Sequence, residues 1–156
     1  MNELNQHPLI QAYIQQNSFG ETLGMDFTIL EEGNVAYQLT IEQKHLATPK
    51  AAHGGVISAL LDATVGVGAL SAVCVDGKVV STVEMKVTFF APALLNDHLT
   101  ATSSLIKKGN RLLFLEAEVV NQNKELIAKA SATLNAYPKE KAGYISAEAE
   151  RFRIRN

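Results

Sequence analysis

The residues best suited to chemistry, His53-Gly54-Gly55, stand at the start of a long apolar segment. That segment predicts a helix, and the backbone N–H groups of a helix's first turn have no partner within the helix. A pair of glycines lets another group approach these N–H groups, where the helix dipole also favours negative charge. The pattern indicates a site for an oxyanion, although glycines also suit a simple tight turn from loop to helix.

Asp62 is the only ionisable side chain between His53 and Asp76. A carboxylate in so apolar a segment is costly unless it is hydrogen-bonded or functional. On a helix it shares a face with mostly small residues, namely Gly55, Ser58, Ala59, Val65, Gly66 and Ala69. This face predicts that another group comes close to Asp62; a structural carboxylate that satisfies backbone donors is the alternative.

Helix geometry separates these two features within one chain. Nine residues at ~1.5 Å per residue place His53 and Asp62 about 13 Å apart and on opposite sides of the helix. If Asp62 activates water against a carbonyl held at the Gly54 N–H, the carboxylate must come from a second, antiparallel copy across a two-fold axis. We therefore expect a homodimer with two equivalent sites.

The charge balance gives no broad attraction for polyanions. Fourteen basic and 16 acidic side chains leave a formal net charge of −2, so neither nucleic acid nor an anionic membrane surface is an expected partner. The N-terminus has neither the basic start nor the apolar stretch of a secretion signal. We expect a cytoplasmic protein.

Cys74 is the single cysteine of the chain, so no intrachain disulfide forms and a reduced compartment is expected. A small buried thiol is its simplest interpretation, and a catalytic cysteine would need an acid or base beside it. The four histidines show no metal-ligand spacing with cysteine or carboxylates. We expect no metal and no cofactor.

The apolar segment from Gly54 to Val75 is about long enough to cross a bilayer. Asp62 would then lie near the bilayer centre, and no aromatic or basic residues anchor the ends. A helix that is apolar all round also arises when it is wrapped by the rest of a domain. We expect this second arrangement and no membrane span.

The remaining pattern predicts one α+β domain over residues 1–156. A short N-terminal helix, within residues 5–17, is expected to pack as a lid, and the core covers residues 23–137. Glu31-Glu32-Gly33-Asn34 is a hairpin signal between two strands. After the long helix, four further strands are expected, at Val79–Phe90, His98–Lys107, Arg111–Asn121 and Leu126–Ala136.

Short connections between these strands favour an antiparallel meander. The predicted fold is one long helix on a curved antiparallel sheet of about six strands. A single helix leaves sheet edges unpaired, which again favours a partner chain. The tail, residues 138–156, is charged and weakly patterned, with at most a short helix expected.

His-Gly-Gly followed by an acid nine residues after the His resembles the hotdog-fold acyl-CoA thioesterases of the phenylacetate-degradation type, relatives of the hydroxybenzoyl-CoA thioesterases. The resemblance covers about residues 23–137. It includes Thr82-Val83-Glu84-Met85 through Phe90-Ala91-Pro92-Ala93 and the turn Lys107-Lys108-Gly109-Asn110-Arg111. It implies hydrolysis of an acyl-CoA by a homodimer, or a dimer of dimers, with coenzyme A present only as part of the substrate.

The resemblance also implies roles for individual residues. The Gly54 N–H would polarise the thioester carbonyl, with Gly55 beside it, and Asp62 of the other subunit would act as general base or nucleophile. Thr82 would orient the attacking water. His53 would hold the loop and the helix start rather than act as a base.

Two further predictions concern the ends of the substrate. Lys107, Lys108, Asn110 and Arg111 would lie near the nucleotide of coenzyme A, where cations and an Arg fork suit phosphate oxygens; a solvated basic turn is the alternative. The acyl group, a medium chain or an aryl ring, would lie against the aliphatic strand faces with Phe89, Phe90 and Phe114.

The chain departs from the family's pattern at Ala47, where an Asn or Gln usually helps to bind the carbonyl. Thr48, or His45 a little earlier, would replace it only in a remodelled loop. This departure keeps open a second class of function, a non-catalytic module that binds acyl-CoA or fatty-acyl groups. A hydratase or dehydratase is less compatible, because His53 and Asp62 lie on opposed faces of one helix.

Overall fold

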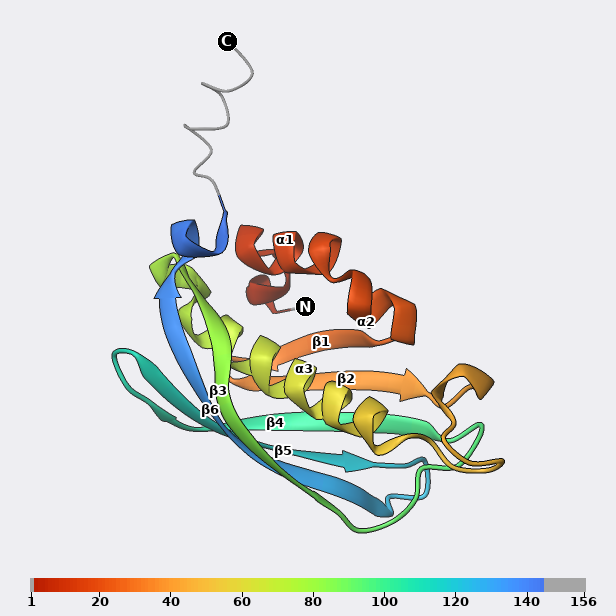
Figure 1. The fold of residues 1–156 in the computed structure, drawn as a ribbon. Coiled ribbons are helices and arrows are strands. Elements are labelled where there is room, and N and C mark those ends of the chain that lie inside the picture. The colour runs from red at the N-terminus through yellow and green to blue at the C-terminus, as the bar shows by residue number, and fades with distance from the viewer. Residues whose placement is uncertain (1, 145–156) are drawn as a thin grey trace.

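A computed structural model describes residues 2–144 (Figure 1). The helical elements are η1 (Glu3–Gln6), α1 (Pro8–Gln16), α2 (Ser18–Leu23), η2 (Gln43–His45), α3 (Gly54–Val73), η3 (Cys74–Asp76) and η4 (Lys139–Ala142). The strands are β1 (Asp26–Glu31), β2 (Asn34–Thr40), β3 (Lys78–Phe89), β4 (His98–Lys108), β5 (Leu112–Val120) and β6 (Leu126–Pro138). All six predicted strands and the long helix are present.

The strands form one antiparallel sheet in the order β1-β2-β4-β5-β6-β3. The predicted meander is therefore correct for β4, β5 and β6 but wrong for β3, which pairs with β6 at the far edge. The connection from β3 to β4, residues 90–97, must cross three strand spacings, about 14 Å. Eight residues reach about 26 Å when extended, so a short connection does not require neighbouring strands.

The helix α3 lies in the concave side of this sheet, which curves around it (Figure 1). Leu60, Leu61 and Val65 are fully buried. By length and composition the segment Gly54–Asp76 is apolar enough to cross a membrane, but 67% of its apolar window is buried inside the protein. The uniform apolarity of α3 therefore follows from its being enclosed by the sheet, as expected for a core helix.

The N-terminal segment is broken into three short helices rather than one. His7 and Asn17 accept hydrogen bonds from the first turns of α1 and α2 through their side chains, which is the usual action of a polar N-cap. The helix α2, which lies after the predicted helix within residues 5–17, was not predicted. The expected start of the C-terminal tail forms η4, and residues 145–156 lie outside the described residues.

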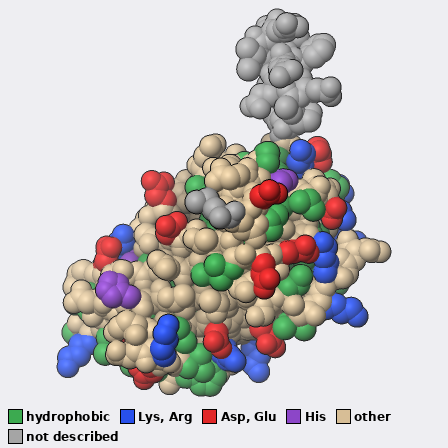
Figure 2. Space-filling view, turned by 180° about the vertical axis from the view of Figure 1, so that it is seen from behind, with side chains coloured by type: hydrophobic (Ala, Val, Ile, Leu, Met, Phe, Trp, Pro, Cys, Tyr) green, Lys and Arg blue, Asp and Glu red, His purple; other side chains and the backbone are tan. Residues whose placement is uncertain are grey.

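The two edges of the sheet are β1 and β3. The edge formed by β3 is 12 residues long, and the side chain of Val83 at its middle is 58% exposed. On the face seen in Figure 2, acidic and basic side chains are interspersed. Long exposed edge strands are natural sites for pairing with another chain.

Candidate active site

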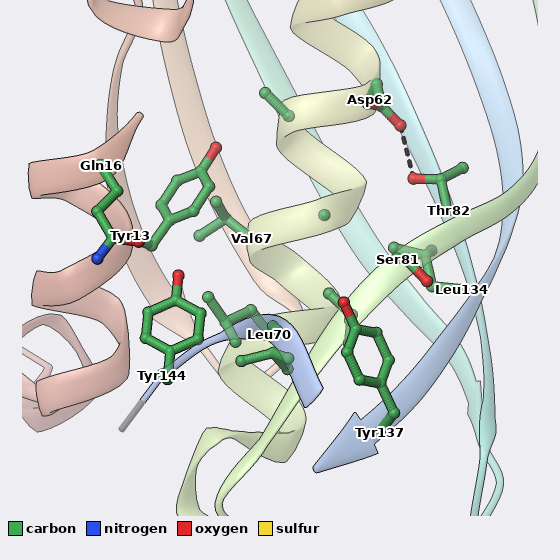
Figure 3. Close-up of a pocket in the computed structure, with 15 residues that line it drawn as sticks. Tyr13, Gln16, Asp62, Val67, Leu70, Ser81, Thr82, Leu134, Tyr137 and Tyr144 are labelled. Carbon is green, nitrogen blue, oxygen red and sulfur yellow. Dashed lines mark hydrogen bonds between the residues drawn. The ribbon is translucent and has the colours of Figure 1, made fainter. Parts of the chain in front are cut away.

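Asp62 and Thr82 meet where the middle of α3 passes β3 (Figure 3). The Thr82 hydroxyl donates a hydrogen bond of 2.7 Å to Oδ1 of Asp62. Both side chains are exposed in the single chain. Among the described residues, Oδ2 of Asp62 makes no hydrogen bond, and the Thr82 oxygen keeps lone pairs that can accept a hydrogen bond from a water.

A β-bulge aims Thr82 at the helix. Thr82 pairs with Leu134 and Glu84 pairs with Thr133, so Val83 is an extra residue on β3. In a regular strand, residues 82 and 84 would face the same side of the sheet. Because of the bulge, Thr82 faces α3, whereas Glu84 accepts a hydrogen bond from Thr133 (3.1 Å). Bulges that re-aim a side chain in this way are common beside active sites.

The start of α3 leaves one backbone donor open. His53 is the N-cap, and its Nδ1 accepts a hydrogen bond from the Gly55 N–H at 2.8 Å. The Val56 N–H donates to the His53 carbonyl at 2.9 Å. Among the described residues, no hydrogen bond engages the Gly54 N–H, which is exposed at the positive end of the helix dipole. Gly54 is therefore the first-turn donor available to a ligand, and a substrate contact by Gly55 stays a prediction.

A shallow recess of about 330 Å³ adjoins this donor, lined by Gly54, Ile57, Phe89 and Phe90 among others. A Cβ on Gly54 would lie 3.5 Å from the Phe89 ring, which is ordinary van der Waals contact. Phe114 lies elsewhere. Its strand neighbours Leu113 and Leu115 are buried against α3, so Phe114 faces the opposite side of the sheet and lines neither this recess nor the Asp62 cavity.

Most polar groups of the loop before α3 are engaged within the protein. The Ala47 N–H donates to the Ala51 carbonyl. The Thr48 hydroxyl accepts from the N–H groups of Lys50 and Ala51 within its own turn. His45 is buried, with Nδ1 accepting from the Glu42 N–H and Nε2 bonded to the Leu23 carbonyl. The Ala47 N–H and both ring nitrogens of His45 are thus occupied in shaping the loop. The Thr48 hydroxyl hydrogen makes no hydrogen bond among the described residues, so a substrate contact by Thr48 stays a prediction.

In the predicted basic turn between β4 and β5, Lys108 and Arg111 each contact other parts of the protein. Lys108 donates to the Ala72 carbonyl at the end of α3 and pairs with Glu32 at 3.2 Å, so its ammonium group serves the helix end. Arg111 donates to Asn135 at 3.0 Å. Lys78, which sequence reasoning missed, reaches the Asn110 carbonyl at 3.3 Å. Phosphate binding by Lys107, Lys108, Asn110 and Arg111 stays a prediction.

A cavity of about 420 Å³ opens beside Asp62 and Thr82, between α3, β3 and α1 (Figure 3). Sequence reasoning missed its three tyrosines, Tyr13, Tyr137 and Tyr144, although it expected the N-terminal helix to act as a lid. Burial raises the pKa of Tyr13, the hydrogen bond with Tyr37 lowers it, and the charge of Asp62 raises it. The net pKa is above the ordinary value, so the Tyr13 phenol stays protonated.

Cys74 takes no part in this arrangement. It lies at the far end of α3, buried, with its thiol donating to the Ser71 carbonyl at 3.6 Å. Burial raises the pKa of the thiol. A thiol with a raised pKa is a weak nucleophile at neutral pH, which agrees with its interpretation as a small core residue.

A long helix enclosed by a curved antiparallel sheet of six strands is the architecture of hotdog-fold proteins. Comparison with known proteins agrees. The family model described as Thioesterase superfamily matches residues 50–128, about half of the chain. The chain therefore belongs to the Thioesterase superfamily, and it is a thioesterase.

Individual relatives place it nearer to one type. Human acyl-coenzyme A thioesterase 13 is 25% identical over 128 residues, covering 80% of this chain and 89% of the relative. Acyl-coenzyme A thioesterase PaaI of Escherichia coli is 23% identical over 124 residues, 75% of this chain and 81% of the relative. The structure of the E. coli PaaI protein from the phenylacetic acid degradation operon has a TM-score of 0.79, at 21% identity, over 86% of this chain and 94% of that one.

One further structure, smu.793 from Streptococcus mutans UA159 bound to acetyl CoA, has a TM-score of 0.67 at 25% identity, over 73% of this chain and 89% of that chain. Together these similarities bear out the predicted fold, a hotdog of the PaaI type, and the predicted enzyme class. They leave the individual roles of the site residues open.

Proposed function

We propose that this protein hydrolyses acyl-CoA thioesters at sites shared between two copies of the chain. The similarity to proteins named acyl-coenzyme A thioesterases supports the substrate class, as does the acetyl CoA in the S. mutans relative. The observation that carries the proposal is the hydrogen-bonded pair of Asp62 and Thr82. This pair supplies a base and a hydroxyl that can position water. The same chain places no group beside the pair that could bind the thioester carbonyl.

The missing group is the open N–H at the start of α3. Gly54 and Asp62 are eight residues apart on one helix, which is about 12 Å along its axis. One carbonyl cannot contact both within a single chain. Two copies that pair antiparallel along the exposed edge of β3 would extend the sheet and bring their α3 helices together in opposite directions. That arrangement would set Gly54 of one copy against Asp62 of the other.

The reaction follows from these groups. The Gly54 N–H donates to the thioester oxygen, where negative charge develops as water attacks the carbonyl carbon. Thr82 accepts a hydrogen bond from that water, and Oδ2 of Asp62 takes one proton from it as general base. The C–S bond then breaks, coenzyme A leaves with the proton as a thiol, and the free acid is released. A pair of helix starts and a pair of acids give two sites per dimer.

The test is a panel of acyl-CoA thioesters with thiol release monitored, run on the wild type and on Asp62→Asn. We expect hydrolysis by the wild type and a loss of at least a hundredfold in kcat for the variant, since one general base contributes about 10²–10⁴. Tight binding of acyl-CoA without thiol release would instead support the non-catalytic binding module, which the alanine at position 47 favours. Equal activity of the two proteins would exclude Asp62 as the base.

A further inference from the structure

Gly66 occupies an unusual position on α3. It lies one turn after Asp62, in the interior of a 20-residue helix, where glycine costs roughly 1 kcal/mol relative to alanine. Gly66 also lines the cavity beside Asp62. Residues four apart share a helix face, so the two positions open onto the same space.

A second glycine on the same helix shows what a packing requirement looks like. A Cβ on Gly68 would lie 2.7 Å from Oγ of Ser103 and 2.9 Å from Cδ2 of Leu115, so the sheet excludes any side chain there. A Cβ on Gly66 would meet no described atom within 4 Å. The packing of the described chain therefore explains Gly68 and does not explain Gly66.

The space beyond Gly66 has a lining suited to an organic group. Val67 and Leu70 from α3 supply an aliphatic wall, and the rings of Tyr13, Tyr137 and Tyr144 stand around the end remote from Thr82 (Figure 3). Cavities of about 300–1,000 Å³ are typical of small-molecule sites. The volume here, about 420 Å³, falls within that range.

The position of the candidate base orients a substrate in this cavity. Asp62 and Thr82 stand at one end, so a thioester carbonyl beside them has its acyl group directed toward the tyrosines or its coenzyme A directed there. Coenzyme A is far larger than the cavity, whereas an acyl group of moderate size fits it. The recess at Gly54 is smaller, about 330 Å³, and shallow.

We propose that Gly66 is a specificity-determining residue, which keeps this cavity open for an acyl group of medium length or with a single ring. The proposal rests on the proposed hydrolysis and adds to it where the acyl group lies and what limits its size. A side chain at position 66 would occupy the part of the cavity one helical turn beyond the carbonyl. Larger acyl groups would then no longer fit, and kcat/KM for their thioesters would fall. The acetyl group ends beside the carbonyl, so kcat/KM for acetyl-CoA would fall much less.

The experiment compares Gly66→Val with the wild type, using octanoyl-CoA, phenylacetyl-CoA and acetyl-CoA. We expect the ratio of kcat/KM for each larger substrate over acetyl-CoA to fall at least tenfold, because one methylene in a tight pocket changes discrimination by about 10–200-fold. A matched control, Ser104→Val, adds bulk on an exposed strand position outside the cavity and should leave the ratio unchanged. An unchanged ratio for Gly66→Val, or an equal loss for all three substrates, overturns the proposal.

Two further measurements distinguish the acyl cavity from a packing role of Gly66 and from the proposed hydrolysis. Gly66→Ala should raise the melting temperature, because the helix gains propensity without a clash, whereas Gly68→Ala should lower it. Binding of non-hydrolysable thioether analogues measures the cavity without turnover: the octanoyl analogue should bind the wild type more tightly than the acetyl analogue, and Gly66→Val should remove the difference. If this difference in binding is found but no thiol is released from any acyl-CoA, the acyl cavity is supported and the proposed hydrolysis is refuted. No difference in the wild type would refute the cavity, even if Asp62-dependent hydrolysis is found.

Discussion

Gly54→Pro tests the proposed oxyanion donor with little disturbance of the fold. Gly54 is the first residue of α3, and its N–H makes no hydrogen bond among the described residues. Proline at this position removes only that N–H, and its fixed φ suits the first helical turn. The preceding residue, His53, has φ −64° and ψ 135°, which is the extended conformation that a residue before proline prefers.

The expected magnitude follows from the number of donors at the site. Removing one oxyanion-hole donor costs about 10²–10³ in kcat, or roughly 3–4 kcal/mol. The loop around Ala47 supplies no side-chain amide here, so we expect the upper part of that range. The free energy of unfolding should not fall, because proline at a compatible position stabilises by about 0.4–1 kcal/mol.

The matched control is Gly54→Ala, which keeps the N–H and adds a Cβ at ordinary contact distance, 3.5 Å, from Phe89. Steady-state thiol release gives kcat for both variants, and thermal unfolding checks that both are folded. We expect Gly54→Ala to retain most of the activity that Gly54→Pro loses. Equal kcat values for the two folded variants would refute the assignment of the Gly54 N–H as the donor.

Two other predictions concern side chains around the site. Thr82→Val removes the 2.7 Å hydrogen bond to Asp62. We expect kcat to fall about tenfold to a hundredfold, since a hydrogen bond to a charged group contributes roughly 1.5–3 kcal/mol. Thr82→Ser should keep most of the wild-type kcat, and a Val variant as active as the Ser variant would contradict the role of the hydroxyl. Lys108→Ala removes the contacts with the Ala72 carbonyl and Glu32 and should lower the free energy of unfolding by about 1 kcal/mol, measured by urea denaturation. Lys107→Ala is its control and should not change stability; equal effects would argue against a special task for Lys108.

Sequence patterns were sufficient for the elements that carry strong local signals. The apolar run after His53 marks α3, and turn residues mark two of the connections: Asp76-Gly77 between the helical segment and β3, and Gly109-Asn110 between β4 and β5. The spacing of His-Gly-Gly to Asp62 identified the two ends of the candidate site, because helix geometry converts spacing directly into distance and direction.

The features that were missed depend on long-range pairing. The bulge at Val83 exists only in the register of β3 against β6, and no residue near it signals an insertion. The three tyrosines of the cavity come from α1, the end of β6 and the segment after η4, so their meeting requires the finished fold. The place of β3 at the sheet edge is a further example, since a short loop permits several neighbours.

The most direct test of the central claim is complementation between two variants that are each inactive. If every site takes its Gly54 N–H from one copy and its carboxylate from the other, a mixed dimer of Gly54→Pro and Asp62→Asn contains one intact site and one doubly altered site. After co-refolding in equal amounts, half of the dimers are mixed and half of their sites are intact, so we expect thiol release at about one quarter of the wild-type rate. A mixture as inactive as its two components would contradict sites shared between copies.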